Sequence, residues 1–294
     1  GVYISEFNTA LDFGWNTIAY VEGGRGLQQN VNEGSSSYNL LIHDNIIHDT
    51  QLDGIVMTTV DPSKGPVEIY NNLIYNTGTG PANAENSGTW TCMNLEAYDP
   101  SGYGPGSGNY QVYNNTLYNC GNWTDPPYDD SEGMLIFEPV SGTSKGMTLT
   151  NNIVCASTVS PYCADSNACH STSGSNNIFY GNEAAPTNSS ITDSINSNPD
   201  LTSLSTPNFQ LESGSPAINA GVTESIVVTD FQGLTRPQGT AYDIGAYEVY
   251  GGGGGSTMTL SASPTSLAFG SVVDRSNSSL QTTLTPPGNS DVSI

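Results

Sequence analysis

Carboxylate side chains recur at matching positions of short apolar segments, and paired carboxylates are the groups that hydrolyse glycosidic bonds. Glu96 and Glu138 each end such a segment. On adjacent strands their carboxyl groups would lie about 5 Å apart, near the roughly 5–5.5 Å of retaining glycosidases. Like charges at that distance raise one pKa, as a general acid requires. We therefore predict Glu96 and Glu138 as a catalytic pair, with Glu132 and Asp53 as accessory acids.

Aromatic and polar side chains near these acids are of the types that bind sugars. A sugar ring stacks on an aromatic face while its hydroxyl groups meet polar side chains. Trp90 and Tyr20 are the predicted sugar platforms. Asn94, Glu22 and Arg25 are the predicted polar residues of the substrate-binding surface.

Two other interpretations of these acids stay open. An outward glutamate on so acidic a chain is usually a solvated side chain, and a Glu pair can hold Ca²⁺ as a structural ion. Asp129 and Asp130 lie in a loop near Glu132 and could line the cleft or bind calcium. They are our predicted metal ligands. No cofactor is expected to be required, and Ca²⁺ is the one ion that the acids suggest.

The two histidines near residue 45 have a similar ambiguity. His43 and His48 stand beside aspartates and could form a metal or acid/base group. The alternative is that they stack onto Tyr70 and Tyr75 of the following repeat.

The charge of the chain limits its partners. The chain has 28 acidic and 5 basic residues, and its net charge is −23. This argues against nucleic acid and anionic membranes, because both need Lys or Arg to neutralise phosphate. It also opposes a polyanionic glycan unless calcium bridges the two. No apolar stretch reaches the roughly 18 residues of a membrane span. The oligomeric state is not indicated.

Five cysteines cannot all pair. Cys163 and Cys169 flank a polar loop and are the first choice for a disulfide. Cys120 and Cys155 could bridge neighbouring turns, and Cys92 is expected to be a free thiol. Loop cysteines in a chain rich in Ser, Thr and Asn indicate export.

One unit repeats along the chain: an alternating apolar strand, a turn centred on asparagine, and a second short strand. Its copies occupy 40–47, 67–74, 110–117, 147–154 and, more weakly, 176–179. Stacked coils bury such strands in one shared core, with equivalent asparagines forming an amide ladder. A β-sandwich is the alternative, but it would not keep a fixed side-chain register over such distances. The repeat predicts asparagine rungs at 45, 72, 115, 152 and 177.

A second strand type lies between these copies, with starts at 18, 55, 92 and 134. The first three starts are 37 residues apart, and the last interval is 42. Carboxylates do not face a dry core unpaired, so the side of the strand that carries Glu132 and Glu138 must be the outward one. Two outward columns are predicted: Asn16, Asp53, Trp90 and Glu132, and Glu22, Thr59, Glu96 and Glu138.

These repeats resemble the right-handed parallel β-helix proteins of the pectate-lyase-like superfamily. The segment 198–248 is similar to the C-terminal end of many secreted bacterial β-helix proteins, with Gly214-Ser215-Pro216-Ala217-Ile218 and Asp243-Ile244-Gly245-Ala246-Tyr247-Glu248 as its clearest parts. The resemblance covers about residues 15–248 and implies a substrate groove on the outward sheet. Lyases of this superfamily use a Lys or Arg base with calcium, and Arg25 is the best candidate for that role.

The predicted fold is all-β: a right-handed parallel β-helix over 1–250, with N-terminal coils missing, then a Gly-rich linker over 251–257. Residues 258–294 resemble the start of an ASPM-SPD-2-hydin-type immunoglobulin-like module, a truncated β-sandwich-like segment. The expected location is extracellular or the bacterial cell surface.

Three functions are compatible with these features. The first is a secreted glycoside hydrolase acting on a neutral or weakly charged polysaccharide. The alternative is a non-catalytic cell-surface, adhesion or glycan-binding β-helix. The third is a calcium-dependent polysaccharide lyase or epimerase.

Overall fold

The chain forms two compact units, Gly1–Gly253 and Gly254–Ile294. The computed structural model describes residues 1–5, 8–30, 36–58, 60–80, 91–97, 109–121, 135–139, 146–155, 162–163, 172–181, 189–250, 261–263 and 283–285. In the second unit it describes β22 (Ser261–Ser263) and β23 (Thr283–Thr285), which pair antiparallel. The immunoglobulin-like module stays a prediction.

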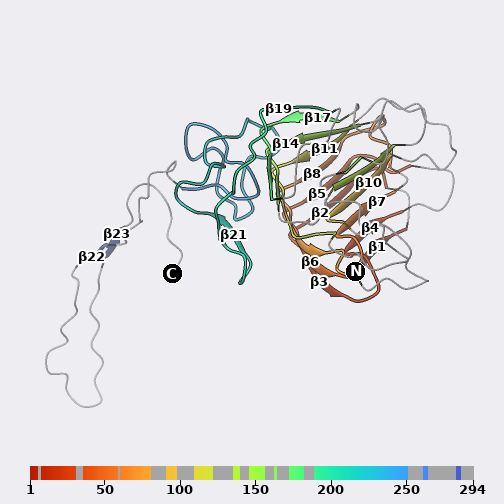
Figure 1. Cartoon of the computed structure of the whole chain (residues 1–294), viewed down its shortest axis with the longest axis horizontal. Coiled ribbons are helices and arrows are strands. Elements are labelled where there is room, and N and C mark those ends of the chain that lie inside the picture. The colour runs from red at the N-terminus through yellow and green to blue at the C-terminus, as the bar shows by residue number, and fades with distance from the viewer. Residues whose placement is uncertain are drawn as a thin grey trace, which may run out of the picture. The chain divides into compact units, whose positions relative to one another are not determined.

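Three parallel sheets build the first unit, and each turn from β1 to β18 contributes one strand to each sheet, after which β19 adds a strand to sheet B (Figure 1). Sheet A contains β1 (Val2–Ile4), β4 (Leu27–Gln29), β7 (Ile55–Met57), β10 (Met93–Ala97), β13 (Leu135–Pro139) and β16 (Tyr162–Cys163). Sheet B contains β2 (Leu11–Gly14), β5 (Leu40–His43), β8 (Val67–Tyr70), β11 (Asn109–Tyr113), β14 (Gly146–Thr150), β17 (Thr172–Ser175) and β19 (Ser190–Thr192). Sheet C contains β3 (Thr17–Val21), β6 (Ile46–Thr50), β9 (Leu73–Thr77), β12 (Thr116–Tyr118), β15 (Ile153–Cys155) and β18 (Ile178–Tyr180).

This arrangement confirms the predicted parallel β-helix. The core lies inside the three sheets because every second side chain of each strand points inward. Leu27, Ile55 and Met93 are in register on sheet A, and all three are fully buried in one cluster. Among the described residues no helix is long and apolar enough to cross a bilayer.

The predicted asparagine ladder is present at the corner between sheets B and C, and it begins one rung earlier, at Asn16. Each Nδ2 donates to the Oδ1 of the next rung at 2.9–3.1 Å, in the order Asn16, Asn45, Asn72, Asn115, Asn152 and Asn177. The residue before each rung has a positive φ. Asparagine and aspartate tolerate this conformation better than bulkier residues, and they occupy it at five of the six rungs, with Trp15 at the first.

The same corner holds the terminal segment, residues 195–250, against the outer face of sheet C. Outward asparagines donate to its backbone: Asn71 to Thr229, Asn114 to Asp243 and Asn151 to Val222. The antiparallel pair β20 (Leu201–Ser203) and β21 (Asn208–Leu211) belongs to this segment. Its apolar residues complete two clusters with sheet C.

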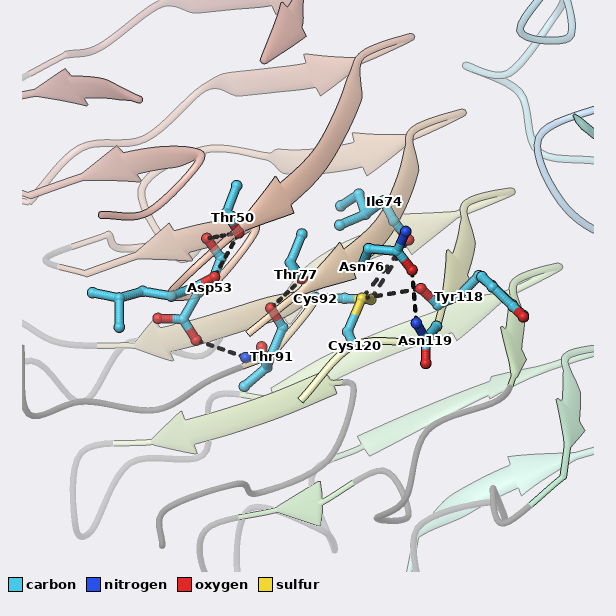
Figure 2. Close-up of a disulfide and its surroundings, with 11 residues drawn as sticks. Thr50, Asp53, Ile74, Asn76, Thr77, Thr91, Cys92, Tyr118, Asn119 and Cys120 are labelled. Atoms are coloured by element: carbon cyan, nitrogen blue, oxygen red, sulfur yellow. Dashed lines mark hydrogen bonds between the residues drawn. A yellow bond between two sulfur atoms is a disulfide. The ribbon is translucent and has the colours of Figure 1, made fainter. Parts of the chain in front are cut away.

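A disulfide joins Cys92 to Cys120 (Figure 2). Cys92 precedes β10 and Cys120 follows β12, so the bond closes the fourth coil on itself. The expectation of a free Cys92 and a Cys120–Cys155 bridge was therefore wrong. The partner of Cys120 lies within its own coil because that coil begins and ends at the same corner. The predicted partner Cys169 of Cys163 lies outside the described residues.

Candidate functional site

The predicted catalytic strands are adjacent and in the predicted register. In the parallel pair β10–β13, residue Glu96 is opposite Glu138 and Asn94 is opposite Ile136. Residues in register on adjacent parallel strands share a face of the sheet, about 4.8 Å apart. The side chains of Glu96 and Glu138 are outside the described part of the chain. Asn94 lies on the side of its strand away from the core and is 4% exposed.

The register between β7 and β10 differs by one residue from the predicted one. Ile55 pairs with Met93, whereas the sequence alignment paired it with Cys92. A slip of one residue moves every side chain to the other face. Ile55 and Met57 therefore lie in the core and not on the outward face.

Asp53 was predicted as an outward accessory acid, and this placement was wrong. Its side chain is fully buried, and its Oδ1 accepts the backbone N–H of Thr91 at 3.1 Å (Figure 2). Its Oδ2 accepts from Nε of Arg25 at 3.1 Å. Burial raises the pKa of Asp53 to about 7, although Arg25 and the backbone donors oppose the rise. Asp53 is thus a buried acid paired with the partly exposed Arg25.

This raised pKa makes stability depend on pH. Between pH 4 and 7 the folded chain keeps a proton on Asp53 that the unfolded chain has lost, so the free energy of unfolding falls as pH rises through this window. The fall is at most roughly 4 kcal/mol and ends above about pH 7. Asp53→Asn mimics the protonated acid, so its own free energy of unfolding should not fall across this window. Urea unfolding should therefore show the difference in free energy of unfolding between variant and native chain shifting in favour of the variant as pH rises from 4 to 7. The exposed Asp193→Asn is the control. A difference that does not change with pH would mean that Arg25 keeps Asp53 ionised.

Tyr20, Glu22 and Asn16 belong to a different part of the solenoid from the one predicted. β3 pairs with β6 in sheet C, so Tyr20 does not share a sheet with Glu96 and Glu138. Tyr20 is 77% exposed and meets His48 edge-on with centroids 5.3 Å apart. The strand that precedes β7 on sheet A is β4. Tyr20 and Glu22 therefore cannot extend the predicted columns.

Several predicted residues lie outside the described part of the chain: Thr59, Trp90, Asp129, Asp130 and Glu132. In the described part, no group of three or more His, Cys, Asp or Glu residues is placed to hold a metal ion. Calcium binding by Asp129 and Asp130 stays a prediction.

Both histidines stack as the structural alternative predicted. His43 lies on Tyr70 and His48 on Tyr75, with centroids 4.9 and 4.7 Å apart. The two ring nitrogens of His43 each meet a carboxylate, Nδ1 with Asp44 at 2.7 Å and Nε2 with Asp12 at 2.8 Å. Burial alone would lower the pKa of His43, but these hydrogen bonds outweigh it and raise the pKa. His43 is thus suited to be a buried imidazolium.

Sequence reasoning missed an acidic surface on sheet B. Glu68 points outward from β8, and Glu224 reaches the same face from the terminal segment, where it hydrogen-bonds Thr150. Burial raises the pKa of each, and the charge of Glu68 raises the pKa of Glu224 further. Tyr113 adjoins both, and burial followed by their two charges raises its pKa. Alternation along 67–70 could have identified Glu68, but no local pattern signals Glu224.

Comparison with known proteins adds little to this geometry. No protein-family model matches the chain, and no curated protein matches its sequence. Among solved structures, the chain is similar to one titled "Crystal structure of pectate lyase Pel9A", with a TM-score of 0.39 and 13% identity, over 81% of this chain and 72% of that one. The parallel β-helix is established by the strand pairing itself, and the chain's activity is a separate question.

Proposed function

We propose that this chain is a carbohydrate-active β-helix that hydrolyses a neutral or weakly charged polysaccharide. The observation that carries the proposal is the in-register pairing of Glu96 with Glu138 on β10 and β13. One strand spacing, about 4.8 Å, is close to the separation in retaining glycosidases, where one carboxyl is the nucleophile and the other the acid/base. The charge of −23 favours an uncharged glycan over a polyanion.

The state of Arg25 favours hydrolysis over elimination. A lyase needs a base that reaches the sugar, and Arg25 was the best candidate for it. Its Nε donates to the buried Asp53, and its side chain is 26% exposed. Arg25 is therefore better suited to bind Asp53 than to remove a proton from a substrate.

The surface formed by Glu68 and Glu224 is the second candidate location for the same reaction. The pKa of each of these neighbouring acids is raised, which is the direction that a general acid needs. The backbones of β8 and β14 are two strand spacings apart, roughly 10 Å. Glu224 hydrogen-bonds Thr150 of β14, and its pKa is raised by the charge of Glu68, so the two acids act on the same face of sheet B.

We also propose that the chain acts outside the cell. The Cys92–Cys120 disulfide supports it, because such bonds persist in oxidising compartments. A polysaccharide outside the cell is the partner that a long solenoid face can bind over several sugar units.

We predict that Glu96→Gln and Glu138→Gln each lower the rate of reducing-end release by about 100-fold or more. Each variant removes one carboxyl group with little change of shape. The assay runs on a panel of neutral and acidic polysaccharides. Glu68→Gln and Glu224→Gln test the second candidate location, and the exposed Asp193→Asn is the control, expected to retain most activity. Circular dichroism verifies that all five variants fold.

Each other outcome selects a different function. Loss confined to the Glu68 and Glu224 variants moves the reaction to sheet B. A product that absorbs ultraviolet light, with activity lost on chelation, identifies a calcium-dependent lyase. Retention of glycan without cleavage by the folded native chain identifies a binding or adhesion protein and overturns the enzymatic proposal.

A further inference from the structure

A row of outward aromatic side chains on sheet C is interrupted at one rung. The strand register aligns Tyr75, Tyr118, Cys155 and Tyr180 on β9, β12, β15 and β18. Tyrosine occupies three of these four positions, and Cys155 occupies the third. A cysteine side chain is much shorter than a tyrosine ring, so the row has a gap between Tyr118 and Tyr180.

A cavity of about 200 Å³ fills this gap. Tyr118, Cys155 and Tyr180 line it from sheet C, and Asp200, Leu204 and Glu212 line it from the terminal segment. Backbone bonding fixes the segment here, since the Glu212 N–H donates to the Asp200 carbonyl at 2.8 Å. Ser215 Oγ donates to the neighbouring Pro199 carbonyl at 2.6 Å. Tyr180 and Leu204 are 37% and 45% exposed, so the cavity opens to solvent.

The charged side chains that line the cavity in the described part of the chain are negative. Among the described residues that line it, Asp200 and Glu212 are charged and none is cationic. The cationic side chains in the described part of the chain pair elsewhere: Arg25 with Asp53, Lys64 with Asp61 and Arg236 with Glu248. A net charge of −23 on the whole chain adds to the attraction for a cation.

We propose that this cavity binds a small organic cation of the alkylammonium class. Two tyrosine rings and two carboxylates are the groups that recognise quaternary and primary ammonium ions, through cation–π and charge attraction. Leu204 supplies an apolar surface for the alkyl groups. A neutral sugar can donate hydrogen bonds to the two carboxylates, but it does not compensate their charge as a cation does. This site is independent of the proposed hydrolysis, because none of its residues lies on sheet A or sheet B.

Choline and its neutral carbon isostere, 3,3-dimethylbutan-1-ol, test the proposal on the full chain. NMR titration at low salt should show choline binding and the isostere binding at least about tenfold more weakly. Asp200→Asn and Glu212→Gln should each weaken choline binding severalfold. The exposed Asp193→Asn removes the same charge away from the cavity and should leave binding unchanged.

Cys155→Tyr restores the interrupted row, fills the cavity and should abolish binding. Because a tyrosine could overpack the buried site, Tyr180→Leu is the second variant, and it should weaken binding about tenfold without filling space. Equal binding of choline and its isostere would overturn the proposal. Equal loss in Asp193→Asn would overturn it too, since it would reveal general attraction to an acidic chain. Binding of a neutral sugar but not of choline would reassign the cavity to glycans.

Discussion

Replacing Arg236 with methionine is expected to lower the free energy of unfolding of the first unit by about 3–5 kcal/mol. Nη1 of Arg236 donates to Oε2 of Glu248 at 2.9 Å, and both side chains are fully buried. Removal of the cation leaves the Glu248 carboxylate buried without its counter-charge. The charges of Asp230 and Asp243 also act on Arg236, so the variant places three acids together without a cation.

The loss should begin in the terminal segment. Arg236 also donates to the carbonyls of Asp243 and Gly245 at 2.9 Å. Gly245 in turn donates to the Asn151 carbonyl, and Ala246 donates to Oγ1 of Thr116. Hydrogen exchange of the Gly245 and Ala246 amides should therefore accelerate before the coils unfold in urea.

Three further variants separate charge from packing. Arg236→Lys keeps the charge but loses the planar fork, so an intermediate loss is expected. The double variant Arg236→Met with Glu248→Met should be less destabilised than the sum of its single variants. Lys64→Met removes an exposed cation and should cost less than about 1 kcal/mol. A loss in Arg236→Met no larger than that of Lys64→Met would show that the buried pair does not hold the segment.

The repeat unit could be predicted from sequence because it depends on residues that are close together in the chain. An apolar strand, an asparagine turn and a second strand recur in each coil, and each asparagine bonds the next regardless of the loops between them. Successive rungs are 29, 27, 43, 37 and 25 residues apart. The asparagine motif itself, and not a constant repeat length, therefore identifies the coils in the sequence.

The wrong placements of β3 and β7 followed from the assumption of a repeat of constant length. The spacing of 37 residues from Ile18 to Ile55 and from Ile55 to Cys92 is a coincidence of loop lengths. It assigned β3 to sheet A, although Asn16 marks it as the strand after the first rung. It also displaced β7 by one residue, which moved Asp53 from the buried side to the outward one.

Local sequence patterns could not predict side-chain partners that are distant in the sequence. Asp53 is buried because Arg25 and Thr91 satisfy its two oxygens, and both are supplied by neighbouring coils. Glu224 meets Glu68 and Tyr113 only because the terminal segment folds back onto the helix. Cys92 pairs with Cys120 because the fourth coil closes at one corner. In each case, the residue is visible in the sequence, but the packing of the coils determines which residue it contacts.

Asn115→Ala, in the middle of the ladder, is expected to cost about 3–5 kcal/mol of unfolding free energy. Oδ1 of Asn115 accepts from the backbone N–H and the Nδ2 of Asn72 at 3.0 and 2.9 Å. Its Nδ2 donates to the carbonyls of Ile69 and Tyr113 and to Oδ1 of Asn152. Asn115 and Asn72 are fully buried, so the substitution leaves several polar groups without partners or water.

The end of the same ladder supplies the control. Asn16 is half-buried, and its Nδ2 donates to Gly14 and Asn45. Asn16→Ala removes these two bonds beside solvent, so we expect a loss of only about 1 kcal/mol. Urea unfolding followed by tyrosine and tryptophan fluorescence measures both variants. Equal losses would show that each asparagine acts through its own turn. A larger loss at Asn115 means that stability depends on bonds passed from coil to coil, which explains how loops of very different lengths fit on one solenoid.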